Sequence, residues 1–283
     1  MSPEKLAALV MLVALMLQAG TEIDPAHLRE ALGNRGLIGR ALLANFVIVP
    51  LFAVLLARLF ALSEYVAIGF LMMAVAPGVP FLVRAAGRKP GGSLGFAAAL
   101  AFIMPALSIV TIPIMAALSV RIDVAVHVPF ANLIVSLVAF QLVPLIVGYL
   151  IVERAPAFAA KLRRPLTIVF LLAVVALFVL IGPKLFTAVG AVYGSRGMWA
   201  ILVLVLLSMA TGWALGGPQP EYRRTLSIAT ALRNIGTCTV IATATFPDTL
   251  VGPTVLTYFL IQFVVSLIPR VFWSRTAQSA RAA

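Results

Sequence analysis

Acidic residues are scarce in this 283-residue chain, which has nine Asp and Glu residues against 21 Lys and Arg residues. Charged residues of both signs make up 11% of the sequence, whereas soluble domains carry about 25%. Hydrophobic residues make up 63%. A water-soluble fold could not bury that much apolar surface, so the composition excludes a soluble globular protein.

Cysteine and histidine are nearly absent. The single cysteine, Cys238, excludes a disulfide within the chain and a zinc site built from clustered cysteines. The two histidines, His27 and His127, lie at the edges of apolar runs, and no acid within those runs could orient them. Catalysis inside a membrane needs a nucleophile with a base, or paired acids, at one site. We therefore expect no enzymatic activity, no metal site and no cofactor.

Long apolar runs separated by short polar segments fill the chain. The runs lie near 6–20, 37–60, 65–86, 94–120, 128–152, 165–188, 198–216, 225–246 and 250–273. The sequence therefore predicts an all-α polytopic membrane protein with about nine transmembrane helices, each of roughly 20 residues, in one domain over 1–283. A signal peptide is the alternative for the first run, but Glu4-Lys5 is a poor basic segment and no clear cleavage site follows.

Basic residues predict the orientation in the membrane. Most of the 21 Lys and Arg residues fall in loops on one side of the predicted helices. Because cytoplasmic loops are enriched in these residues, we expect an N-terminus outside the plasma (inner) membrane and a cytoplasmic tail over 274–283. The basic residues are scattered without interleaved aromatics, so the net charge of +12 indicates contact with the lipid bilayer and no nucleic-acid partner.

Two of the predicted helices contain residues that disfavour a regular helix at mid-membrane. Pro77-Gly78-Val79-Pro80 lies near the middle of 65–86. Proline removes a backbone donor and clashes with the preceding turn, so this helix is either broken or kinked. Arg233 lies near the middle of 225–246. An arginine there costs roughly 2.5–3.5 kcal/mol on insertion scales, and such charges usually line a cavity or a substrate path.

Polar residues around Arg233 form a candidate site. Thr230, Arg233, Asn234 and Thr237 follow the i, i+3, i+4, i+7 spacing, so they would share one face if the segment were helical. Structural alternatives stay open, because Arg233 could brace the fold and the threonines could bond back to the preceding turn. All nine acids fall in loops or at helix ends, so none is expected to lie at membrane depth.

The two interrupted helices are the third and the eighth in the predicted order, and they run antiparallel. This order fits an inverted repeat, with 1–120 as a first unit that lacks its opening helix and 121–273 as the second unit. Paired interruptions at corresponding positions of two halves indicate the binding site of a transporter, where the helix ends and Arg233 would favour an anion.

Four segments resemble the bile acid:sodium symporter family. They are 18–25, 44–50, 76–78, and 224–228 followed by Asn234 and Gly236. The third segment is similar to the Cys-Pro-Gly-Gly opening of the family's first crossing helix. The resemblance implies a core domain and a panel domain, with two unwound helices that cross at the midplane. It also implies a substrate contact at Asn234, another close to Gln262, and a sodium-ligand amide at Asn45.

The resemblance breaks where sodium should bind. The family's crossing-helix glutamate falls on Ala229, its glutamine on Arg233, and its Ser-Asn pair on Leu82 and Val83. Hard cations need several oxygen ligands, so sodium binding is doubtful. We hypothesise that Arg233 places a fixed cation where family members bind a transported one.

These observations predict a secondary transporter that moves a small organic anion by alternating access without a standard sodium site. The candidate substrate-binding residues are Arg233, Asn234, Thr230, Thr237, Pro77, Gly78, Asn45 and Gln262. One alternative is an arsenite or auxin-type efflux carrier of related fold, for which Cys238 could supply a thiolate. Another is a membrane sensor or assembly partner that transports nothing.

Overall fold

The computed structural model describes residues 2–77, 82, 92–120 and 130–282, which form helices and one isolated β-bridge. The helices are α1 (Pro3–Glu22), α2 (Pro25–Gly33), α3 (Arg35–Leu43), α4 (Val49–Leu59), α5 (Glu64–Val75), α6 (Leu94–Val120), α7 (Phe130–Leu137), α8 (Val143–Arg154), α9 (Pro156–Gly194), α10 (Gly197–Leu215), α11 (Pro220–Ala231), α12 (Ile235–Thr245) and α13 (Val251–Ala282). Two π-helical segments, η1 (Ala44–Ile48) and η3 (Val138–Leu142), join α3 to α4 and α7 to α8.

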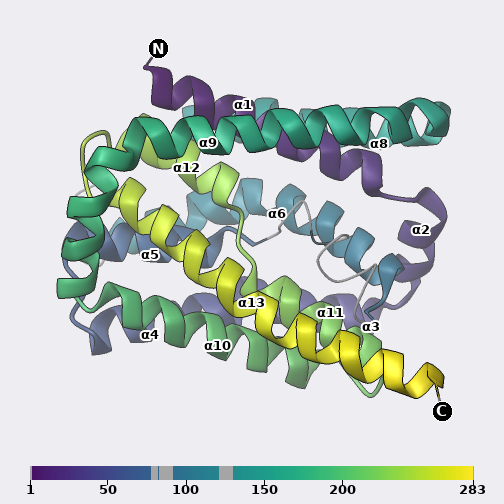
Figure 1. Cartoon of the computed structure of the whole chain (residues 1–283). Coiled ribbons are helices and arrows are strands. Elements are labelled where there is room, and N and C mark those ends of the chain that lie inside the picture. The colour runs from purple at the N-terminus through teal and green to yellow at the C-terminus, as the bar shows by residue number, and fades with distance from the viewer. Residues whose placement is uncertain (1, 78–81, 83–91, 121–129, 283) are drawn as a thin grey trace.

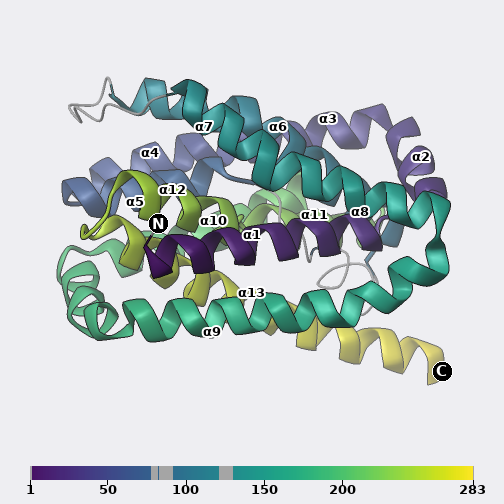
Figure 2. The same cartoon turned by 90° about the horizontal axis from the view of Figure 1, so that it is seen from above.

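Three helices lie side by side along one face of the molecule. These are α1, α8 and α9, seen along the top of Figure 1, and α1 lies between the other two in Figure 2. We call them the three-helix layer. Beneath this layer, α10 packs against α4, α11 and α13, and α13 packs against α5 and α12. The N-terminus and the C-terminus lie at opposite ends of the bundle in both views, which fits an odd number of crossings.

Glycines let the backbones of α1 and α8 touch. A side-chain carbon on Gly20 would overlap the carbonyl oxygen of Leu145, and one on Gly148 would overlap the carbonyl oxygen of Leu17. Membrane helices gain little from burying apolar side chains against each other, because lipid is equally apolar, so they associate through close packing at small residues. The reciprocal glycine contact therefore fixes the crossing of α1 and α8.

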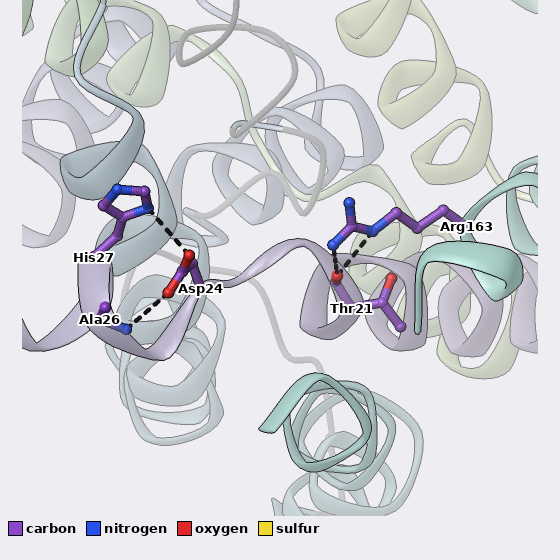
Figure 3. Close-up of polar contacts among 5 residues, drawn as sticks. All are labelled: Thr21, Asp24, Ala26, His27 and Arg163. Carbon is purple, nitrogen blue, oxygen red and sulfur yellow. Dashed lines mark hydrogen bonds and ion pairs between the residues drawn. The ribbon is translucent and has the colours of Figure 1, made fainter. Parts of the chain in front are cut away.

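The end of α1 is held by an arginine of α9. Nε of Arg163 donates to the carbonyl oxygen of Thr21 over 3.0 Å, and Nη2 donates to the same oxygen (Figure 3). The last carbonyls of a helix have no partner within it, so a cationic donor there satisfies one of them. The next helix begins at once, because the Asp24 side chain accepts a hydrogen bond from the N–H of Ala26 and caps α2.

Seven helices in the described part of the chain are long and apolar enough to cross a membrane. They lie at Pro3–Glu22, Arg35–Leu59, Leu94–Pro113, Ile134–Arg154, Pro156–Leu180, Gly197–Leu215 and Val251–Pro269. These agree with seven of the predicted runs. The predicted third helix is the shorter α5, and the predicted eighth is divided into α11 and α12, so the count of nine stays a prediction.

The π-helical segments each precede a proline. Pro50 and Pro144 lie two residues after η1 and η3, respectively. A proline has no N–H to continue the α-helical pattern. The backbone widens before it, so that the N–H of Val49 bonds to the carbonyl of Ala44 five residues earlier. Single π-turns are frequent at functional sites, and these two carry Asn45 and Gln141.

Replacing Gly148 with alanine should lower the melting temperature of the purified protein, because the methyl group would push α8 away from α1. Overpacking of this kind costs about 1–3 kcal/mol. Gly39→Ala in α3 is the matched control, since nothing lies within 4 Å of a side-chain carbon at that position. Equal melting temperatures for the two variants would contradict the close crossing.

Candidate functional site

Two interrupted helices meet through their backbones. Helix α5 ends at Val75, and the helical pattern of α11 and α12 is broken between Ala231 and Ile235. Pro77 and Arg233 form the isolated antiparallel bridge. Next to it, the N–H of Asn234 donates to the carbonyl oxygen of Ala76 over 2.9 Å. Thus the Pro77 segment and the Arg233 segment, 156 positions apart by their numbers, lie against each other in extended form.

The predicted polar residues around Arg233 do not share one helical face, because the segment that carries them is not a continuous helix. Leu232 is extended, with φ −85° and ψ 125°. Asn234 starts a new helix instead, because its side-chain oxygen accepts a hydrogen bond from the N–H of Thr237 over 3.2 Å. Asparagine is among the residues preferred at the start of a helix, because its side chain can accept such a backbone hydrogen bond. Successive side chains alternate in extended backbone, so Arg233 and Asn234 face different neighbours.

Gln262 of α13 holds the extended backbone of Arg233. Its Oε1 accepts a hydrogen bond from the Arg233 N–H over 2.8 Å, and its Nε2 donates to the Arg233 carbonyl over 3.3 Å. The side-chain amide thus pairs with one residue as a neighbouring strand would. A polar backbone without partners in an apolar interior would be costly, and Gln262 removes that cost.

Asn234 and Thr237 face a glutamine that the sequence analysis did not single out. Oε1 of Gln141 accepts hydrogen bonds from Nδ2 of Asn234, over 3.2 Å, and from the hydroxyl of Thr237. Nε2 of Gln141 donates to the carbonyl of Pro105 over 2.6 Å and to the hydroxyl of Ser108 over 2.8 Å. Its amide is therefore fully bonded and joins η3 to α6 and α12. A lone polar residue within an apolar run, three residues before Pro144, was the signal that could have identified it.

The Arg233 side chain is buried without a carboxylate partner among the described residues. Its relative exposure is 0%, and Nε, Nη1 and Nη2 form no hydrogen bond of regular geometry in the described part of the chain. The hydroxyl of Tyr258 lies close enough to the guanidinium to interact with it, and it is neutral. Arg233 is the only charged side chain among the buried described residues. A buried charge that faces only a neutral hydroxyl is unfavourable in an apolar interior.

The remaining predicted site residues are Thr230, Asn45 and Gly78. The Thr230 hydroxyl lies 2.7 Å from the Ser208 carbonyl of α10 and 2.8 Å from the Leu226 carbonyl of its own helix, so it links α11 to α10 and not to the Gln141 cluster. Asn45 donates to the Ala41 carbonyl over 2.9 Å, and its buried Oδ1 has no partner among the described residues. Gly78 lies outside the described residues.

Cys238 is a buried thiol on α12. Its sulfur donates to the carbonyl oxygen of Met72 over 3.5 Å. Over the described residues, no group of three or more His, Cys, Asp and Glu side chains is arranged to hold a metal ion.

Comparison with known proteins gives one family. The model of the Sodium Bile acid symporter family matches residues 9–189. The hepatic sodium/bile acid cotransporter of Rattus norvegicus is 26% identical over 279 residues, which cover 92% of this chain and 74% of the rat protein. The Homo sapiens protein of the same name is 24% identical over 277 residues, covering 93% of this chain and 78% of its own.

A second kind of relative is matched over a smaller part of its length. The P3 protein of Homo sapiens is 27% identical over 201 residues, which cover 68% of this chain and 41% of the human protein. The chain therefore matches less than half of the length of that relative.

Gln141→Leu should lower the melting temperature, because it leaves Asn234, Thr237 and Ser108 without their buried partner. Each unsatisfied buried group costs about 1–3 kcal/mol. The control is Thr211→Val, which removes a hydroxyl that bonds only to the Leu207 carbonyl of its own helix. If Q141L melts no lower than T211V, the Gln141 network does not hold these helices together.

Proposed function

Because the chain belongs to the sodium bile acid symporter family, we propose that it is a secondary transporter that moves a small organic anion by alternating access without a standard sodium site. The family match and the seven long apolar helices make the chain an integral membrane protein. The proposal rests on the buried guanidinium of Arg233, for which the described residues provide no carboxylate partner.

The arrangement of helices supports the family architecture. The three-helix layer corresponds to the panel domain, and the helices beneath it correspond to the core. The backbone bridge between Pro77 and Arg233 supports two unwound helices that cross. Under this proposal α5 and α11–α12 are the third and eighth of nine helices, and they are the matching members of inverted repeats over 1–120 and 121–273. Alternating access is then a movement of one layer against the other.

The residues at the expected ion site are unsuited to sodium. Ala229 and Leu82 are buried apolar side chains at positions where the resemblance implies oxygen ligands. Arg233 adds a positive charge at a third such position, and like charges repel a second cation. Sodium would therefore meet fewer ligands and an unfavourable field. We infer that the Arg233 guanidinium takes the place of the ion.

The same charge favours an anionic substrate. Asn234 and Thr237 lie on the side that faces Gln141 of η3, between the core and the three-helix layer. We propose that they contact the substrate there. The guanidinium acts from the other side of the extended segment, and the N-terminus of α12 adds the positive end of a helix dipole. Pro77 and Gln262 hold the backbone of this site. Substrate contacts of Gly78, Thr230 and Asn45 stay predictions.

The orientation follows from the charge distribution. The N-terminal parts of α9 and α11, which contain Arg163, Arg223 and Arg224, lie at the end of the bundle that also carries the C-terminus (right in Figure 1). We infer that this end is cytoplasmic in the plasma (inner) membrane and that the N-terminus is outside.

Transport should not depend on sodium. The anion for the assay is the one from a panel of organic anions that most raises the melting temperature of the purified protein. Its uptake into proteoliposomes should be equal in sodium and in choline, because no sodium ion completes the site. Uptake that falls to background in choline would refute the proposal.

Arg233→Gln should weaken binding of that anion about 10- to 100-fold, since a hydrogen bond to a charged group contributes about 1.5–3 kcal/mol. Arg233→Lys keeps the charge, so its affinity for the anion should fall less. Arg58→Gln, at the end of the bundle opposite the C-terminus, should leave the affinity unchanged. Equal affinity of R233Q and the unmodified protein would show that Arg233 is a structural brace.

The double variant Ala229→Glu, Arg233→Gln should gain sodium-dependent thermal stabilisation, because it restores two ligand positions that the resemblance implies. Potassium at the same concentration is the control. Stabilisation by both ions alike would indicate a general salt effect, and stabilisation by neither would mean that the ion site differs from the one inferred.

A further inference from the structure

A pair of half-buried arginines lies away from Arg233, at the end of the bundle that carries the C-terminus. Gly216 and Gly217 connect α10 to α11 there, and Gly217 has a φ of +82° that favours glycine. The tight turn brings Arg223 back onto it, so that Nε of Arg223 donates to the Gly217 carbonyl over 2.6 Å. The chain reversal therefore sets the position of the Arg223 guanidinium.

A second guanidinium reaches the same glycine from α3. A side-chain carbon on Gly217 would lie 3.0 Å from Nη2 of Arg40 and 3.3 Å from Nη1, so the Arg40 guanidinium points its two Nη atoms toward this turn. Nε of Arg40 donates to the Gly36 carbonyl of its own helix over 3.3 Å. Neither Arg40 nor Arg223 forms an ion pair with a carboxylate in the described part of the chain. Two like charges on one turn repel, so an anion between them would stabilise both.

An aromatic stack lies beside the two arginines. The rings of Trp213 and Trp273 are stacked, with centroids 5.6 Å apart and an interplanar angle of 21°. The Arg223 guanidinium carbon lies 5.9 Å from the centroid of Trp213. Trp213 is 37% exposed. It lies two residues before the end of its membrane-crossing helix, and Trp273 lies four residues after the end of another. Tryptophans at this depth mark the boundary between hydrocarbon and headgroups.

We propose that Arg40, Arg223 and the stacked pair Trp213 and Trp273 form a binding site for the phosphate of an anionic phospholipid. The two guanidinium groups bind the phosphate, and the indole rings pack against the glycerol and the upper acyl chains. The position at the headgroup boundary favours a lipid over a soluble phosphate, because the ligand must reach the arginines and the rings together. Basic clusters of this kind recognise anionic headgroups at the membrane surface.

The experiment uses the full chain in phosphatidylcholine nanodiscs, into which phosphatidylglycerol is titrated. Bound phosphatidylglycerol is counted by native mass spectrometry. Arg40→Gln, Arg223→Gln should lower its affinity about fivefold for each arginine removed. The control is Arg58→Gln, Arg196→Gln, which removes the same charge from exposed arginines at the opposite end. Arg223→Lys should restore most of the affinity.

Three results would overturn the proposal. One is an unchanged affinity in the Arg40 and Arg223 variant. Another is an equal loss in the Arg58 and Arg196 variant, which would show only a general attraction between charges. The third is that glycerol 3-phosphate, which has no acyl chains, binds as tightly as the lipid. If the double glutamine variant is not recovered folded, Arg40→Gln alone gives the test, since its side chain bonds only to its own helix. None of these results depends on transport or on Arg233.

Discussion

Backbone groups released by an interrupted helix inside an apolar bundle must find partners, and in this chain two interruptions supply them to each other. The antiparallel bridge between Pro77 and Arg233, with the adjoining hydrogen bond from Asn234 to Ala76, satisfies groups that neither segment could satisfy alone. Gln262 completes the pairing on the other edge of Arg233. In hydrocarbon each unpaired group costs several kcal/mol, so both interruptions must lie at the same depth.

The backbone pairing of the two interrupted segments determines the directions of the Arg233 and Asn234 side chains. An extended residue sends its side chain away from that of the next residue, so the segment presents Arg233 toward Tyr258 and Asn234 toward Gln141. The polar network of Gln141 then joins η3 to α6 and α12, across the boundary between the three-helix layer and the rest. If one layer moved against the other, the hydrogen bonds of Gln141 would either break or move together with one layer. Gln141 therefore links the two layers in this structure.

Much of the fold could be predicted from the sequence because apolar runs of membrane length have few alternatives to helices. The seven long helices agree with predicted runs, and Pro77 and Arg233 do mark departures from regular helix. The pairing of Arg233 with Gln262 joins two predicted site residues. The shared helical face failed because Asn234 is a better start for a new helix than an interior residue, a local preference that the spacing rule ignores.

The rest of the site could not be predicted from residue spacing. The partners of Gln141 come from two separate parts of the chain, and Thr230 bonds to α10 because Gly212 lets the two helices touch. Such contacts depend on the packing of distant helices. A glutamine in an apolar run shows only that a partner exists. It does not say which helix supplies it.

A cation fixed on the protein changes what can drive transport. A bound sodium ion that is released on the other side brings the energy of its gradient, whereas the guanidinium of Arg233 cannot leave. Among the buried described residues, no His, Asp or Glu is available to carry a proton instead. An anion moved by such a carrier follows its own gradient and the membrane potential, which favours a monovalent anion on the positive side by roughly 2.3 kcal/mol per 100 mV. If Arg233 replaces the ion, the chain is suited to moving an anion from the negative side of the membrane to the positive side, or to exchanging one anion for another. It is not suited to accumulating an anion on the negative side against the membrane potential.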